Sequence, residues 1–347
     1  MFLGIEIGGT KLQLGVGPGD GSPLAAFERV TVDTKAGAEG ILQHIEQIGG
    51  RLIQRHNVEG VGVGFGGPIQ ADEGRIIKSH QISGWDDFQL GPWCQAKLGL
   101  PTCVENDCDA ASLAEARFGA GKNARVVLYV TVGSGIGGGL IIDGEIYRGS
   151  GRGAAEIGHL RPGLHADRSD ETVEAVASGW GIAAAAHARL LGHVAKPFVP
   201  LTNGLTAGRP NEMRERLIEA EEIEEAAAAD LLHRCDGSIE QLTAKTIAQA
   251  AADGNLIAGE ILTHACEVLG WAIGQAITLF APNVVVVGGG VALMDESQFL
   301  APLRSQVDRY VFPTFQGTFQ ILPAQLGEQV VVHGALAAAA LRANVEG

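Results

Sequence analysis

Two glycine-rich turns between apolar segments constrain the fold of this chain more than any other feature. The first lies in GIEIGGTKLQLGV, which begins at Gly4, and the second lies in VTVGSGIGGGLII, which begins at Val130. The apolar segments on both sides of the glycines predict a β-hairpin in each case. Each hairpin is followed later by a buried-strand pattern that ends in glycines, VGVGFGGPI from Val61 and VVVVGGGVA from Val284. This repetition predicts two similar α/β halves that enclose a ligand cleft, unless glycine-rich α/β chains produce the likeness by chance.

The composition indicates a globular protein and limits its partners. The chain has 347 residues, 46% of them hydrophobic and 19% charged, and this length allows two domains. The formal net charge is −15 and no basic run occurs, so we expect no nucleic-acid partner and no anionic membrane surface. No uninterrupted apolar stretch of membrane-spanning length is evident. Five cysteines without a CxxC spacing, and an N-terminus without a signal-peptide pattern, favour a cytoplasmic protein.

The two glycine turns are candidate phosphate sites. GSGIGG at residues 133–138 matches the dinucleotide pattern G-x-G-x-x-G, but a strand-like segment follows where that fold requires a helix. No Walker sequence occurs either. The sequence instead predicts two hairpin turns whose backbone N–H groups point at an anion. A single such turn would be better explained as a hairpin without a ligand, whereas two at matching positions favour phosphate.

The segment VENDCDAASLAEARFGAG supplies a candidate catalytic group. Asp107 falls at the end of a predicted strand and the start of a helix predicted over 108–118, which Gly119 ends. An ordinary N-cap is one explanation of this aspartate. The other is a base near a cleft, which takes the proton of a substrate hydroxyl as a phosphoryl group arrives. Asn106 beside it can donate to and accept from a second hydroxyl.

Three further polar residues suit a polyol ligand. GAAEIGHLRPG contains Glu156 and His159, and ETVEAVASG contains Glu174. A sugar requires such groups because each hydroxyl both donates and accepts, although for any one of them an unrelated hydrogen bond is the commoner explanation. His159 and His165 could suggest zinc, but no cysteine or third histidine is near in sequence, so structural zinc is not expected.

Extra material lies at about residues 192–245, within the second half. It contains PNEMRERLIEAEEIEEAAAADLL, which predicts an acidic helix with too few apolar positions for a core. We interpret it as a peripheral insertion. A solvated surface helix without a role is the favoured explanation, and a lid is the alternative.

Taken together and in order, these motifs resemble the ROK family (repressors, open reading frames and sugar kinases), within the actin-like ATPase superfamily that includes the hexokinases. The resemblance covers nearly the whole chain apart from the insertion. The motifs that carry it are GIEIGGTKLQLGV, GVGFGGPIQADEGRIIKSHQISGW, VENDCDAASLAEARFGAG, YVTVGSGIGGGLIIDGEIYRG, GAAEIGH and NVVVVGGGVA. It implies an α/β fold of two RNase-H-like domains around a cleft. On this basis we place the smaller domain at 1–115 with a C-terminal helix at about 332–347, and the larger domain at 116–331.

The resemblance also implies where ATP is expected. The phosphates would lie at the two hairpin turns, and the adenosine near the glycines of the last buried strand. The residues concerned are Gly8, Gly9, Thr10 and Lys11 in the first turn, Gly133, Ser134, Gly135 and Gly137 in the second, and Gly288, Gly289 and Gly290 by the adenosine.

The family's sugar site maps onto the remaining candidates. Asp107 matches the catalytic base, and the positions that match sugar contacts are Asn106, Glu156, His159 and Glu174. The bend at Gly67 and Pro68 and the SGW turn at Trp85 would shape the pocket.

This chain departs from the family pattern at three places. Glu6 stands where the family usually has aspartate, and it can still hold Mg²⁺ through water, with an altered metal geometry. Gln81 stands where the family has a sugar-binding asparagine, which leaves the identity of the sugar open. The stretch 159–174 lacks the cysteines of the family's zinc site, so the loop must be held in another way.

The sequence as a whole predicts an ATP-dependent hexose kinase, with glucose as the first candidate acceptor and Mg²⁺ as the metal. The alternatives are a kinase for an N-acetylhexosamine or fructose, and a catalytically inactive sugar-binding protein. A sugar-responsive repressor is disfavoured because no helix-turn-helix pattern precedes the first strand. By resemblance alone, a homo-oligomer is expected.

Overall fold

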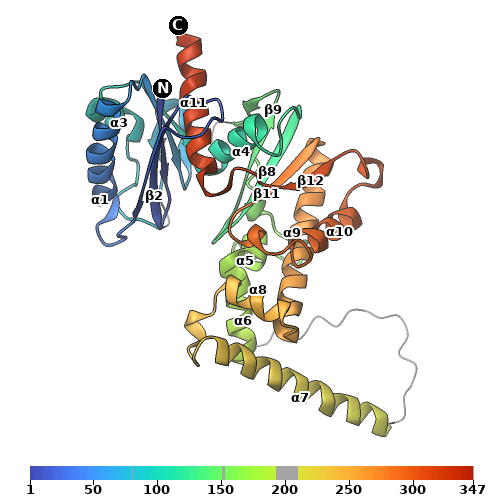
Figure 1. The fold of residues 1–347 in the computed structure, drawn as a ribbon. Helices are drawn as coiled ribbons and strands as arrows, with labels where there is room; N and C mark the ends of the chain where they lie inside the picture. Colours follow the sequence, from blue (N-terminus) through green and yellow to red (C-terminus); the bar gives the residue numbers. More distant parts are fainter. Residues whose placement is uncertain (80, 151–152, 193–209, 347) are drawn as a thin grey trace.

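The computed structural model describes residues 1–79, 81–150, 153–192 and 210–346 (Figure 1). Its first sheet has the strand order β3-β2-β1-β4-β7. β1 (Phe2–Ile7) and β2 (Lys11–Gly17) form the predicted hairpin, and β3 (Ala26–Thr31) extends it antiparallel. β4 (Gly60–Phe65) lies parallel to β1, and β7 (Thr102–Asn106) lies parallel to β4.

The second sheet repeats this order as β10-β9-β8-β11-β12. β8 (Val126–Val132) and β9 (Ile136–Ile142) form the second hairpin, which β10 (Glu145–Ile146) extends. β11 (Val284–Gly288) and β12 (Gln320–Pro323) continue the sheet in parallel with β8. The matching order gives the sequence repetition its structural basis and confirms the two-sheet α/β architecture.

Helices cover both faces of each sheet, which explains why the central strands are apolar along their whole length. In the first domain one face packs against α1 (Gly37–His44), α2 (Gly50–Arg55) and α3 (Leu90–Leu98). In the second sheet, alternate residues of β8 belong to opposite faces. Leu128 and Val130 are part of one hydrophobic core, and Val127 and Tyr129 are part of another. The helices of the second domain are α5 (Val173–Ala177), α6 (Gly179–Leu190), α7 (Pro210–Arg234), α8 (Ala244–Ala252), α9 (Leu256–Phe280) and α10 (Leu300–Tyr310).

Two helices lie between the sheets and join them (Figure 1). α4 (Asp107–Phe118) packs against β8 and β9, and α11 (Val330–Glu346) packs against β1 and β4 and crosses α4. The crossing is close because Gly334 lies against the backbone of Ala110, where no side chain would fit. The C-terminal helix therefore returns to the first sheet. The domain boundary at residue 115 stays a prediction, since α4 contacts both halves.

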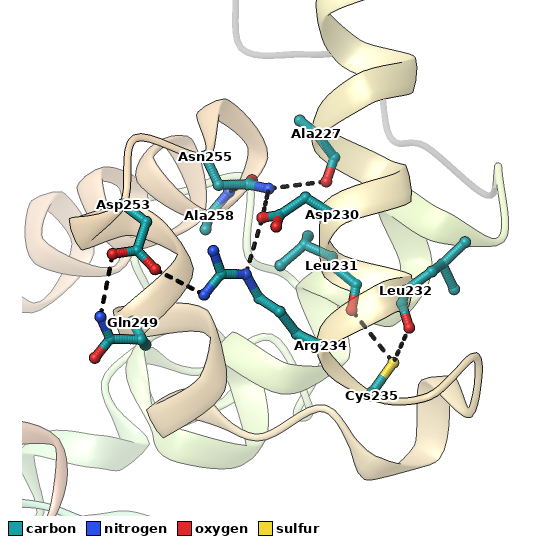
Figure 2. Close-up of polar contacts among 10 residues, drawn as sticks. All are labelled: Ala227, Asp230, Leu231, Leu232, Arg234, Cys235, Gln249, Asp253, Asn255 and Ala258. Carbon is teal, nitrogen blue, oxygen red and sulfur yellow. Dashed lines mark hydrogen bonds and ion pairs between the residues drawn. The ribbon is translucent and has the colours of Figure 1, made fainter.

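The insertion is described only from Pro210 onward, and residues 193–209 lie outside the described residues. α7 is the acidic helix expected there, and Figure 1 shows it projecting along the outer end of the second domain. Its C-terminal end is fixed by polar contacts (Figure 2). The Arg234 guanidinium bridges Asp230 and Asp253 at 2.9 Å each, and Asn255 Nδ2 donates to the Asp230 carboxylate and the Ala227 carbonyl at 2.8 Å.

Helix α9 is long and apolar enough to cross a membrane by length and composition, although Glu260 and Glu267 interrupt its apolar run. Its most apolar window is 56% buried within the protein. It packs against α5, α8 and α10, so the core of the second domain explains its composition.

We predict that Glu115→Ala lowers the free energy of unfolding by at least about 3 kcal/mol, because three backbone N–H groups lose their acceptor. The side chain is fully buried, and its two oxygens accept from Ala120, Gln325 and Leu326 at 2.8 Å each. Denaturant unfolding would measure the loss. The control is Glu225→Ala on the exposed part of α7, for which we expect a change within about 0.5 kcal/mol. Equal losses in the two variants would contradict the bridging role of Glu115.

Candidate active site

The carboxyl ends of three strands in the first sheet bring the first glycine turn and Asp107 together. Ile7 is paired with Phe65, and Phe65 is paired with Asn106, so the three strands end side by side. The Gly66 N–H donates to the Ile7 carbonyl at 2.9 Å, which closes the loop after β4 onto the turn. Parallel strands place ligands at this edge of an α/β sheet.

The second sheet forms an equivalent edge. Thr131, which lies just before the second glycine turn, is paired with Gly288, the last residue of β11 and the first of three consecutive glycines. Gly289 has a φ of +91° and packs on the backbone of Val132, directly before the second turn. A residue other than glycine would clash there and would also be strained. The second turn and the run from Gly288 to Gly290 are therefore neighbours, as expected for parts of one nucleotide site.

Asp107 is the first residue of α4, and Asn106 is its N-cap. The Asn106 Oδ1 accepts from the Cys108 and Asp109 N–H groups at 2.8 and 3.3 Å, and its Nδ2 donates to the Gly67 carbonyl at 3.1 Å. Asp107 is therefore not the N-cap of α4, because Asn106 fills that position. The Asp107 carboxylate is thus free of the capping role.

The Asp107 carboxylate lies beside the first turn. A Cβ placed on Gly66 would be 3.3 Å from the Asp107 Oδ2 and 3.8 Å from the Gly8 Cα. Burial raises the pKa of Asp107 to about 6, and the negative charge of Glu156 adds to the effect of burial, although a hydrogen bond from the Cys108 N–H lowers it. A carboxylate with a raised pKa accepts a proton more readily near neutral pH, as a general base requires.

The following residues on α4 contact the second hairpin. The Cys108 Sγ occupies the space that a side chain on Gly137 would fill, and the Ser112 Oγ does the same at Gly139. Since Asp107 directly precedes Cys108, it lies between the two glycine turns. This position is compatible with a base that acts on a phosphoryl acceptor, and that role of Asp107 stays a prediction.

A cavity that is open to solvent lies beside Asn106 and Asp109, and Asp107, which lies between them in the chain, is not among its lining residues. Asn106 and Glu156, two of the predicted sugar contacts, line it together. Its other lining residues are Pro68, Ile69, Ala71, Asp109, Gly138, Arg148, Gly153 and Ala154. His159 lies at the surface, with its Nδ1 3.6 Å from the Glu156 Oε2. Trp85 packs between Phe65 and Phe88 in the core and is not among the lining residues.

Two predicted sugar contacts lie on the glycine turns instead. The Glu174 Oε2 accepts from the Ile136 N–H at 2.7 Å and fills the space next to Gly135. The Gln81 Oε1 covers Gly9 in the first turn. The sequence placed both residues in the sugar site, and their roles there stay predictions that require these side chains to leave the turns.

The two turns retain backbone donors for an anion. The Gly8 N–H donates to the Lys11 carbonyl and the Gly133 N–H to the Gly135 carbonyl, which closes each hairpin. The N–H groups of Thr10 and Ser134 donate to no acceptor among the described residues. Such groups fit phosphate oxygens, so the residues present fit ATP as a substrate.

Glu6 does not fit the role of a metal ligand. It is buried, its Oε1 is 3.1 Å from the Lys11 Nζ, and its Oε2 lies 2.6 Å from the Gln13 side-chain amide, which donates to it. Burial raises the pKa of Glu6, and the Lys11 charge opposes this shift. Both oxygens therefore have partners. The described residues contain no cluster of three or more acidic, histidine or cysteine side chains that could hold a metal ion. Mg²⁺ at Glu6 stays a prediction that the geometry does not favour, and we derive no step through it.

Sequence reasoning missed the charged residues around the cavity. Glu105 is buried, and both of its oxygens contact the Arg148 guanidinium, at 2.9 and 2.8 Å. Asp109 is buried at the cavity wall. The available signal was the segment ENDCD, in which acidic residues alternate at positions 105, 107 and 109. This segment covers the end of β7 and the start of α4.

The two sheets with the same strand order, and a candidate site at the ends of their parallel strands, define a protein with the two-domain actin-like architecture. The ROK family model matches residues 2–342, and the chain belongs to this family. A glucokinase from Streptomyces coelicolor is 31% identical over 342 residues, which cover 96% of each chain. The crystal structure of a ROK family glucokinase from Streptomyces griseus in complex with glucose and AMPPNP superposes with a TM-score of 0.75 at 30% identity, over 97% of this chain and 98% of the other. The ROK hexokinase from Thermus thermophilus gives a TM-score of 0.72 at 26% identity, over 100% and 99%.

The raised pKa of Asp107 predicts a pH-dependent stability. A carboxyl whose pKa is higher in the folded state than in the unfolded state loses stability as pH rises from the unfolded pKa to the folded one. For Asp107 this interval runs from 3.8 to about 6. We expect Asp107→Asn to stabilise the fold relative to the parent by on the order of 2 kcal/mol at pH 8, and by much less at pH 4. Denaturant unfolding at both pH values measures how much the free energy of unfolding of the variant exceeds that of the parent. An equal excess at pH 4 and pH 8 would contradict the burial of an ionised Asp107.

Proposed function

We propose that this protein is an ATP-dependent sugar kinase that phosphorylates a primary hydroxyl of a hexose, with glucose as the first candidate. The placement of Asp107 between the two glycine turns carries the proposal. The glucokinase relatives support the sugar and phosphotransfer parts, and the glucose and AMPPNP complex of the Streptomyces griseus protein supports ATP as the donor.

In the proposed reaction Asp107 accepts the proton of the sugar hydroxyl. The oxygen then forms a bond to the γ-phosphorus of ATP in line, and the bond from that phosphorus to the bridging oxygen breaks, which releases ADP. The N–H groups of the turns at Gly8–Lys11 and Gly133–Gly137 would stabilise the charge on the phosphate oxygens. Lys11 contributes a positive charge at the first turn, where it also neutralises Glu6.

The cavity binds the sugar in this proposal. Asn106 and Glu156 face it. The Glu156 carboxylate can accept from hydroxyls, and the Asn106 Nδ2 has a second N–H besides the one that it donates to the Gly67 carbonyl. His159 lies next to Glu156, and a modest closure of the two domains would bring it toward the sugar. Closure also excludes water, which would otherwise compete with the sugar for the phosphoryl group. The Gly288–Gly290 segment is proposed to contact the adenosine.

The sugar itself is tested by an assay of ADP production with a panel of acceptors. We expect the highest kcat/KM with glucose among glucose, mannose, fructose, N-acetylglucosamine and N-acetylmannosamine. Higher activity with fructose or an N-acetylhexosamine would show that the acceptor is not glucose, and the proposed phosphotransfer reaction would stand. Sugar binding without ADP production from any member of the panel would instead indicate an inactive sugar-binding protein.

For the base, we predict that Asp107→Asn lowers kcat by at least about 100-fold, since general-base catalysis contributes that much or more. Sugar affinity, measured by calorimetry without ATP, should change far less than kcat, because the proton transfer that the substitution removes occurs only in the transition state and the other sugar contacts remain. A control is Asp143→Asn in the exposed β9–β10 turn, where asparagine tolerates the φ of +53°. An unchanged kcat in Asp107→Asn would remove Asp107 from the mechanism.

A further inference from the structure

Asp109 is a buried carboxylate in the cavity wall that the proposed reaction does not use. Only 6% of the residue is exposed, and it lines the cavity together with Asn106 and Glu156. Its backbone N–H is held by the Asn106 Oδ1, which fixes the start of α4. Its carboxylate oxygens accept no hydrogen bond from any residue that the structure describes. Carboxylates in this state are completed by water or by a ligand.

The surroundings of Asp109 are predominantly negative. Glu105, Asp107 and Glu156 lie near it, and Arg148 is the nearby positive charge. The Arg148 guanidinium is already paired with both oxygens of Glu105. Burial raises the pKa of Asp109 to about 7, and the charge of Glu105 raises it further while Arg148 lowers it. An uncompensated carboxylate in such a place destabilises the ligand-free protein, as binding sites often do.

Asp109 and Asp107 face different parts of the site. Residues two apart in an α-helix are separated by about 200° around the axis. Asp107 lies against Gly66 and the first turn, whereas Asp109 lies at the cavity wall shared with Arg148. A ligand that contacts both must extend past Asn106, so the group that reaches Asp109 differs from the hydroxyl that Asp107 deprotonates.

We propose that Asp109 is a further sugar-binding residue, whose carboxylate accepts a hydrogen bond from a hydroxyl other than the one that is phosphorylated. This inference rests on the proposed sugar kinase function and names the class of substrate more closely. The carboxylates around the cavity favour a neutral hexose with a free hydroxyl at this position. They disfavour a sugar acid, because a further negative charge would meet Asp109, Glu156 and Asp107.

The first test is Asp109→Asn, which keeps the shape of the side chain. We expect the sugar dissociation constant and KM to rise about tenfold, typical of a lost hydrogen bond to a charged group, with kcat changed less than threefold. Because a buried unpaired charge is removed, the same variant should have a higher melting temperature at pH 8 without sugar. If Asp109 instead stabilised the fold, Asp109→Asn would have a lower melting temperature than the parent protein. Asp143→Asn is the matched control and should change neither quantity.

The second test identifies the hydroxyl. Sugar binding is measured by calorimetry for the parent protein and Asp109→Asn, with the accepted hexose and its monodeoxy analogues. For one analogue, and not for the others, the substitution should have no effect, because the hydroxyl that Asp109 binds is already missing.

The outcomes separate this inference from the proposed function. If the parent protein phosphorylates no sugar, the proposed function fails. If the parent phosphorylates a hexose but Asp109→Asn binds that hexose with parental affinity, only the role of Asp109 fails. A loss of affinity that is the same for every deoxy analogue would also overturn it, since no single hydroxyl would then be recognised.

Discussion

The packing of helix α4 between the two sheets is the interaction on which the rest of the site depends. The helix begins at the edge of the first sheet, where Asn106 caps it and Asp107 faces the first glycine turn. The next residue, Cys108, fills the space above Gly137 in the second hairpin, and Ser112 fills the space above Gly139. Because glycine leaves no side chain there, the helix approaches the second sheet closely. A single helix thus sets the distance between the carboxylate and both turns.

The sequence predicted the architecture well, because its signals are local or repeated. Apolar periodicity marked the hairpins, and the glycines marked their turns and the ends of β4 and β11. The same signals placed Asp107 at a strand end, which the pairing of Phe65 with Asn106 brings to the site edge. The resemblance to the ROK family then supplied the fold class, which the family match and the glucokinase structure confirm.

The rest depended on contacts between distant segments, which no local pattern encodes. Glu174 and Gln81 are far from the glycine turns in sequence, yet they lie against Gly135 and Gly9. Glu6 is in the expected strand, but its charge is compensated by Lys11 rather than exposed to a metal. Asp109 lines the cavity together with Arg148 and Glu156, which are distant from it in sequence.

The central claim is that Asp107 faces a sugar hydroxyl while the two glycine turns hold the phosphates of one ATP. A crystal structure of the protein with the accepted hexose and a non-hydrolysable ATP analogue tests it most directly. The account predicts a hydrogen bond from a primary hydroxyl to the Asp107 carboxylate, and phosphate oxygens at the N–H groups of Thr10 and Ser134. A sugar bound with no hydroxyl near Asp107, or a triphosphate that contacts neither turn, would contradict it.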